Sequence, residues 1–131
     1  MSHNASSKAV EMAEKYYDST EADAFYLNVW GGEDIHIGLY ETLDEDIARA
    51  SRRTVETMAG YLTKLTTKSR VIDLGSGYGG AARYLTKNFG CFIDCLNLST
   101  TQNLLNHKYN LKAGVTETID AVSYTHLTLP T

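Results

Sequence analysis

Apolar residues between Asp44 and Leu65 recur every three to four positions, which is the spacing of one face of a helix. Thr42, followed three residues later by Glu45, gives the pattern typical of a capping box at a helix start. Acidic residues gather at the beginning of this stretch and lysines at its end, an arrangement that complements the helix dipole. We therefore expect a long amphipathic helix that starts at Asp44.

The first forty residues are rich in aromatic side chains and also show a helical pattern. Apolar residues at helical spacing predict a short amphipathic helix through Tyr17, with Ser6 or Ser7 as its N-cap. Gly31 and Gly32 interrupt whatever helix precedes them. We expect a turn at these glycines and extended chain after it.

Strand and helix patterns alternate in the second half of the chain. The short apolar run 71–74 predicts a buried parallel strand, which is followed by a glycine-rich turn and a helix that closes at Gly90. The stretch 91–99 predicts a second strand. Ser99 with Gln102 then gives another capping-box pattern, at the start of a further helix.

This order of elements is the beginning of a doubly wound α/β sheet. The predicted fold class is α/β, the N-terminal part of a Rossmann-like fold with a parallel sheet and helices on both sides. We expect residues 1–43 to form a helical aromatic lid and residues 44–121 to form the first half of the Rossmann-like domain. Two parallel strands cannot bury both faces of a sheet, so we expect the front half of a larger domain.

The last ten residues, 122–131, need a separate interpretation. They read VSYTHLTLPT, which matches one reading frame of a common transposon sequencing adapter at every position. Their residue types also suit a strand. We expect the segment to be a sequencing artefact and leave it out of the fold prediction.

Composition limits the kind of partner. The 131 residues are 43% hydrophobic and 21% charged, which is typical of one soluble domain. A net charge of −4 without a dense Lys/Arg run argues against binding nucleic acid or anionic membranes, so we expect a small-molecule partner. No apolar run approaches the roughly 18 residues of a membrane span and the first ten residues do not resemble a signal peptide, so we expect a cytoplasmic protein. The oligomeric state is not indicated.

Cysteines and histidines give no sign of a disulfide or a metal site. Cys91 and Cys95 are four residues apart in a predicted strand, too far for a bridge between them. The four histidines form no metal-ligand spacing with each other or with the cysteines. We therefore predict no metal.

The glycine-rich turn after the first predicted strand fits two cofactor patterns. Gly75, Gly77 and Gly80 satisfy GxGxxG, the fingerprint of dinucleotide-binding turns. With Asp73 and Gly79, the turn also satisfies (D/E)xGxGxG, which resembles motif I of the class I S-adenosyl-L-methionine-dependent methyltransferases. Spacing alone does not choose between them, and glycines also mark bare turns. The carboxylate favours the second pattern, because it suits the cationic amino group of a methionine tail and would repel a pyrophosphate.

Asn97 follows the second predicted strand, where both cofactor classes usually carry an acidic residue for the ribose hydroxyls. An amide can donate to a diol and accept from it, without the charge that strengthens such bonds. Asp94 is the alternative ligand, although we expect it to point back along the strand. Asn97 is also compatible with a plain turn.

Longer stretches carry a more specific resemblance than the glycine motif does. They are YYDSTEADAFYLNVWGGEDIHIGLYE (16–41), ASRRTVETMA (50–59), VIDLGSGYGGAARYL (71–85) and DCLNLSTTQN (94–103). Together they resemble the glycine, sarcosine and dimethylglycine N-methyltransferases of betaine synthesis over about Lys15 to Tyr109. Phosphoethanolamine methyltransferases are similar too, with a comparable aromatic lid.

The resemblance implies a full class I methyltransferase fold, S-adenosyl-L-methionine as cofactor and a small-molecule amine as substrate. The cofactor-binding residues it implies are Tyr26, Ile35, Asp73, Gly75, Ser76, Gly77, Gly79, Asn97, Leu98 and Gln102. It also places Tyr17 over the cofactor near the transferred methyl group, which makes Tyr17 a candidate catalytic residue. His36 is the second catalytic candidate, as a general base, although a lone histidine is more often simply hydrogen-bonded.

Methyl transfer from a sulfonium to an amine depends on positioning and desolvation. Aromatic faces stabilise a sulfonium or a methylated ammonium by about 0.5–2 kcal/mol each, so the aromatic side chains of the lid either serve the reaction or pack the core. Arg52 and Arg53 are expected to be solvated or paired, and we do not assign them to the substrate.

Four functional hypotheses follow. The first is an N-methyltransferase of sarcosine and dimethylglycine, or of glycine and sarcosine, present here as a fragment. The second is a phosphoethanolamine-type or other small-molecule methyltransferase. The third is an NAD(P)-binding oxidoreductase that uses the same turn, and the fourth is a fragment without catalytic activity.

Overall fold

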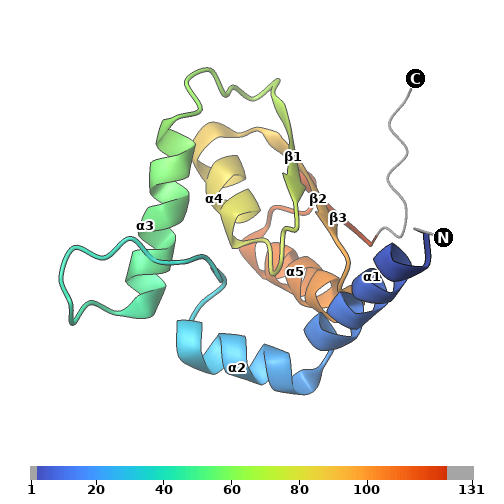
Figure 1. Cartoon of the computed structure of the whole chain (residues 1–131). Coiled ribbons are helices and arrows are strands. Elements are labelled where there is room, and N and C mark those ends of the chain that lie inside the picture. The colour runs from blue at the N-terminus through green and yellow to red at the C-terminus, as the bar shows by residue number, and fades with distance from the viewer. Residues whose placement is uncertain (1–2, 124–131) are drawn as a thin grey trace.

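The computed structural model describes residues 3–123, which form a small parallel sheet with helices packed beside it (Figure 1). The elements in chain order are α1 (His3–Tyr17), α2 (Thr20–Trp30), α3 (Ile47–Gly60), β1 (Arg70–Leu74), α4 (Gly80–Phe89), β2 (Phe92–Asn97), α5 (Thr100–Ala113) and β3 (Ile119–Ser123). From β1 onward, strands and helices alternate as the sequence predicts.

The sheet contains three parallel strands in the order β1-β2-β3. Asp73 on β1 pairs in register with Cys95 on β2, and Leu96 on β2 pairs with Val122 on β3. The expectation of only two strands is therefore wrong. The third strand was missed because it is short and because its last two residues belong to the tail that was left out of the fold prediction.

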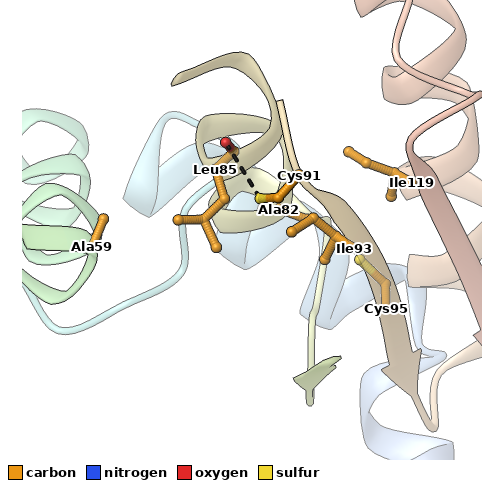
Figure 2. Close-up of a cluster of buried hydrophobic side chains, with 7 residues drawn as sticks. All are labelled: Ala59, Ala82, Leu85, Cys91, Ile93, Cys95 and Ile119. Carbon is orange, nitrogen blue, oxygen red and sulfur yellow. Dashed lines mark hydrogen bonds between the residues drawn. The ribbon is translucent and has the colours of Figure 1, made fainter. Parts of the chain in front are cut away.

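One hydrophobic core lies between the sheet and the helices beside it (Figure 2). Its buried members are Ala59, Ala82, Leu85, Cys91, Ile93, Cys95 and Ile119. Both cysteines are free and buried, and Cys91 Sγ lies 3.8 Å from the carbonyl oxygen of Leu85. Burial, assisted by the nearby Asp73, raises the pKa of Cys95 to about 11, so this thiol stays protonated and packs as a small apolar group.

Helices α4 and α5 cover the same face of the sheet. The strands step across the sheet in one direction, and right-handed crossovers then place both connecting helices on one side. Ile93 and Ile119 pair in register on this covered face and are buried. Ile72 and Leu74 on the opposite face are 61% and 63% exposed. The helices expected on that second face do not occur among residues 3–123.

Helix α3 is shorter at both ends than the predicted helix. Asp46 occupies the N-cap position without a capping hydrogen bond from its side chain. The carboxylate of Glu45 accepts from the backbone N–H of Glu41 at 2.9 Å and pairs with Arg53, and Thr42 lies before the N-cap residue Asp46. The capping-box prediction for this helix is therefore wrong. The helix ends at Gly60, a residue that disfavours the helical interior, so Leu62 and Leu65 fall in the following loop.

Of the predictions for the two N-terminal helices, the one for the end of α2 is confirmed and the one for the start of α1 is wrong. Helix α1 begins at His3, so the prediction of Ser6 or Ser7 as its N-cap is wrong. The break after α2 is confirmed: Gly31 has a φ of 65° and its N–H donates to the carbonyl of Leu27. Residues 32–43, between α2 and the predicted start of the next helix, contain neither helix nor strand, as expected.

The expected boundary between residues 121 and 122 falls inside β3. Residues 124–131, which make up most of the predicted adapter segment, lie outside the described residues. Among residues 3–123, no helix combines the length and the apolar character that a membrane crossing requires.

Candidate cofactor and methyl-transfer site

The glycine-rich turn joins the carboxyl end of β1 to α4. The N–H groups of Gly75 and Ser76 both donate to the carbonyl oxygen of Leu96, at 2.8 and 3.2 Å, which ties the turn to the neighbouring strand. Gly77 has a φ of 55°, and a Cβ atom there would lie 3.3 Å from Ile35 Cδ1. The turn therefore passes directly against the loop that follows α2, and a side chain at Gly77 would crowd that contact.

A cavity of about 270 Å³ opens beside this turn. It is lined by Tyr17, Ile35, Gly75, Gly77, Leu96, Asn97, Leu98 and Gln102. All of these residues except Leu96 were predicted from the sequence to take part in cofactor binding or catalysis. They come from α1, the loop after α2, the glycine-rich turn, β2, the residue that follows β2, and α5, so separate parts of the chain converge at the sheet edge where α/β proteins bind ligands.

Asn97 and Gln102 form a neutral amide pair in the cavity wall. Asn97 Nδ2 donates to Gln102 Oε1 at 2.9 Å. Gln102 is buried, and its Nε2 has no hydrogen-bond partner within the described part of the chain. A buried donor without an acceptor is costly, so a ligand that accepts from Gln102 would gain stability. Asp94 is engaged elsewhere, by Arg70 at 2.7 Å.

The capping prediction at the start of α5 is confirmed in its first half only. Ser99 Oγ accepts from the N–H of Gln102 at 3.1 Å, as an N-cap serine should. The side chain of Gln102 turns to Asn97 and does not complete a reciprocal capping box.

Hydrogen bonds link the backbone of Tyr17 and the neighbouring Asp18 to the start of α5. Ser99 Oγ lies 3.0 Å from the carbonyl oxygen of Tyr17 and 2.6 Å from Asp18 Oδ1, and the N–H of Thr101 donates to the same carboxylate at 3.0 Å. Burial would raise the pKa of Asp18, but the hydrogen bonds from Ser99 and Thr101 outweigh it and hold that pKa below its usual value. A carboxylate at this helix N-terminus is also favoured by the helix dipole.

Aromatic side chains of α1 and α2 form a contiguous cluster. The rings of Tyr17 and Tyr26 stack with centroids 6.4 Å apart, and the ring of Trp30 lies 5.4 Å from that of Tyr26. Burial, together with a hydrogen bond to Tyr16, raises the pKa of Tyr26 to about 12, so its hydroxyl stays neutral. Tyr17 is the member of this cluster that also lines the cavity.

Two carboxylates, Asp73 and Asp34, lie close enough to His36 to interact with it electrostatically. Burial raises the pKa of Asp73, and the nearby His36 acts in the opposite direction. Burial also raises the pKa of Asp34, which Arg52 opposes from 2.9 Å. The backbone carbonyl of His36 accepts from Trp30 Nε1 at 3.0 Å, which fixes the loop. The catalytic role of His36 stays a prediction.

Some predicted residues lie outside the cavity lining as the structure describes it. They are Tyr26, His36, Asp73, Ser76 and Gly79. Arg52 and Arg53 are paired with carboxylates, as expected. Sequence reasoning missed Asp18 as the anchor of Tyr17, because its partner Ser99 is 81 residues away. Within residues 3–123, no group of three or more His, Cys, Asp or Glu side chains could hold a metal ion.

Curated proteins match most of this chain. It is 48% identical over 124 residues to a glycine/sarcosine/dimethylglycine N-methyltransferase of Actinopolyspora halophila, covering 95% of this chain and 22% of that protein. It is 50% identical over 115 residues to a sarcosine/dimethylglycine N-methyltransferase of Halorhodospira halochloris, covering 88% of this chain and 41% of that protein. No family model matches the chain.

A solved structure gives the same assignment. A candidate sarcosine dimethylglycine methyltransferase from Galdieria sulphuraria superposes with a TM-score of 0.73 at 47% identity, covering 80% of this chain and 42% of that one. The chain has a class I methyltransferase fold and resembles the glycine/sarcosine/dimethylglycine N-methyltransferases. It spans less than half the length of each of these relatives.

Proposed function

We propose that this chain supplies the S-adenosyl-L-methionine-binding part of an N-methyltransferase that acts on sarcosine and dimethylglycine, or on glycine and sarcosine. The observation that carries the proposal is the cavity at the glycine-rich turn, where Tyr17, Gly77 and Asn97 meet. The curated relatives support the proposal, because proteins named for methylation of these amines are similar to most of this chain. We also propose that the protein is cytoplasmic.

The residues around the cavity fit such a cofactor. The buried Nε2 of Gln102, which has no partner within residues 3–123, and the amide of Asn97 suit a ribose diol. The carboxylate of Asp73 lies just before the turn and suits an ammonium group on the methionine end. The cavity, at about 270 Å³, is close to the lower end of typical small-molecule pockets, about 300–1,000 Å³.

When bound, the cofactor supplies an electrophilic methyl group on a sulfonium. The chain's own part is to orient and to exclude water. Tyr17, held through its backbone by Ser99, lines the cavity, and we propose that its ring offers a cation–π face to a positive centre. The stacked ring of Tyr26 restricts where the ring of Tyr17 can move.

His36 is proposed as a group that influences protonation near the turn. It lies close enough to Asp73 to act on the pKa of that carboxyl, and its positive form would keep Asp73 ionised. An ionised Asp73 is the form that can pair with an ammonium group. We also propose that His36 acts as a general base toward the amine.

The proposal is tested by methyl transfer and by a competition titration. The longest natural reading frame that contains the chain should transfer label from methyl-labelled cofactor to sarcosine, dimethylglycine or glycine. The 131-residue chain should bind S-adenosylhomocysteine, and NAD should not displace it. Transfer to none of the three amines would contradict the N-methyltransferase assignment, and displacement by NAD would favour an oxidoreductase.

A further inference from the structure

An arginine in the first turn of α4 is buried although it does not line the cavity. Arg83 is 3% exposed. A buried guanidinium must find several hydrogen-bond acceptors, because removing its charge from water is costly. The positions of those acceptors therefore show what the residue holds together.

The acceptors of Arg83 belong to three separate segments. Its Nε donates to Glu33 Oε2 at 2.7 Å, in the loop after α2. Its Nη1 donates to Asn106 Oδ1 at 2.9 Å and to Asn110 Oδ1 at 2.8 Å, both on α5. Its Nη2 donates to the backbone carbonyl of Tyr78 in the glycine-rich turn. One planar fork thus joins a loop, a turn and a helix.

Each of these segments also contributes a residue to the lining of the cavity. The loop contributes Ile35, the turn contributes Gly77, and α5 contributes Gln102. The loop and the turn touch directly where Ile35 packs against Gly77. A shift of one segment relative to the others would therefore change the shape of the cavity.

The contact between the turn and α5 is tight. A Cβ atom at Gly79 would collide with the side chain of Asn106, the same residue that accepts from Arg83. The guanidinium also lies over the ring of Tyr109, with Cζ 5.3 Å from the ring centroid. The turn and the helix have little room for independent movement while Arg83 is in place.

We propose that Arg83 is a positioning residue that holds the Glu33 loop, the glycine-rich turn and α5 in one arrangement competent for cofactor binding. The inference rests on the proposed function for the cofactor, but the clamp itself is a property of the chain. Lysine cannot replace it, because a single ammonium cannot serve acceptors on three sides in the planar geometry of a guanidinium.

The test compares Arg83→Lys and Glu33→Ala with Glu56→Ala. Glu33 and Glu56 each pair with an arginine and are similarly exposed at 38% and 36%, but the Arg49–Glu56 pair joins two residues of the same helix, α3, whereas the Arg83–Glu33 pair joins two segments. Two quantities are measured on the 131-residue chain well below its melting temperature: amide hydrogen exchange at residues 33–36 and 75–79 without ligand, and the affinity for S-adenosylhomocysteine by calorimetry.

We expect both clamp variants to raise exchange in the loop and in the turn and to weaken S-adenosylhomocysteine binding about tenfold, the usual scale for losing one charge-assisted hydrogen bond. Glu56→Ala should change neither quantity. If Arg83→Lys does not fold, Glu33→Ala decides alone, because it removes only a half-exposed partner. A lower melting temperature with unchanged affinity, or faster exchange in the loop alone, would overturn the proposal.

The same experiment separates this inference from the proposed function. If the unmodified chain does not bind S-adenosylhomocysteine, the proposed function is contradicted before any variant is compared. In that case faster exchange in both segments of Glu33→Ala would still support the clamp, and unchanged exchange would overturn it.

Discussion

Asn97 donates a 2.9 Å hydrogen bond to Gln102, and this amide pair stands where related sites usually carry a carboxylate. The bond leaves Asn97 Oδ1 able to accept and the buried Nε2 of Gln102 able to donate to a ligand. The cavity wall can therefore recognise a pair of hydroxyl groups without placing a negative charge beside them.

The amide pair predicts how the wall responds to substitution. Asn97→Leu removes both polar atoms and leaves Gln102 unpaired, so we expect S-adenosylhomocysteine binding to weaken about tenfold or more. Asn97→Asp cannot donate to Gln102 Oε1, so the Gln102 amide must turn over and donate to the new carboxylate. The carboxylate still accepts strongly from a hydroxyl group, so we expect a smaller loss of affinity than in Asn97→Leu. Calorimetric titration of both variants checks this, and equal losses would argue against a role for Asn97 in hydroxyl recognition.

Asp18 predicts a pH-dependent contribution to stability. Its pKa is lowered in the folded chain, so its contribution is fully present above the pKa of the unfolded chain, about 3.9, and is lost as the pH falls through the lower folded value. Asp18→Ala should reduce the free energy of unfolding by about 1 kcal/mol at pH 7, as for other lost helix caps. Urea titrations at pH 7 and pH 3 should show the difference shrinking in acid, and a loss that grows in acid would contradict this reading.

Gly79→Ala tests the contact between the turn and α5. Gly79 has a φ of 79°, and an added Cβ would also collide with Asn106. Gly114→Ala is the matched control, because Gly114 has a φ of 70° with nothing within 4 Å of an added Cβ. We expect about 1 kcal/mol of destabilisation in the control and up to about 3 kcal/mol at Gly79. Equal losses in urea denaturation would show that the collision is relieved without cost.

The uncovered sheet face predicts a contrast between two isoleucines. Ile72 is 61% exposed, whereas Ile93 on the covered face is 1% exposed. Ile93→Ala should lower the free energy of unfolding by about 2–4 kcal/mol, and Ile72→Ala by about 0.5 kcal/mol or less. Ile72→Ser should also reduce binding of a hydrophobic dye by the folded chain. Similar losses at the two positions would mean that Ile72 is covered in solution.

Local sequence patterns predicted the structure correctly where the interacting residues are close together along the chain. The glycine-rich turn, the break at Gly31 and the capping role of Ser99 depend on neighbours within a few residues, and the structure agrees with these predictions. The capping-box prediction at Glu45 failed because the helix starts later, with Asp46 as its N-cap, and the carboxylate of Glu45 binds Arg53 and the N–H of Glu41.

The same patterns could not predict contacts between residues that are far apart in the sequence. Asp18 meets Ser99 across 81 residues, and Glu33 meets Arg83 across 50, and no local spacing signals either pair. The strand Ile119–Ser123 is too short for a clear periodic signal, and its partner β2 lies beyond an intervening helix. Only the packed chain brings these residues together.

We propose that the turn after β1 holds the methionine end of S-adenosyl-L-methionine, beside Tyr17 and Asn97. Backbone amide chemical shifts of the 131-residue chain, recorded during titration with S-adenosylhomocysteine, test it most directly. Binding at this turn should give saturable changes concentrated at residues 75–79 and 96–102 and at Ile35, with little change at the amino ends of the strands. Absence of saturable changes at the glycine-rich turn would contradict it.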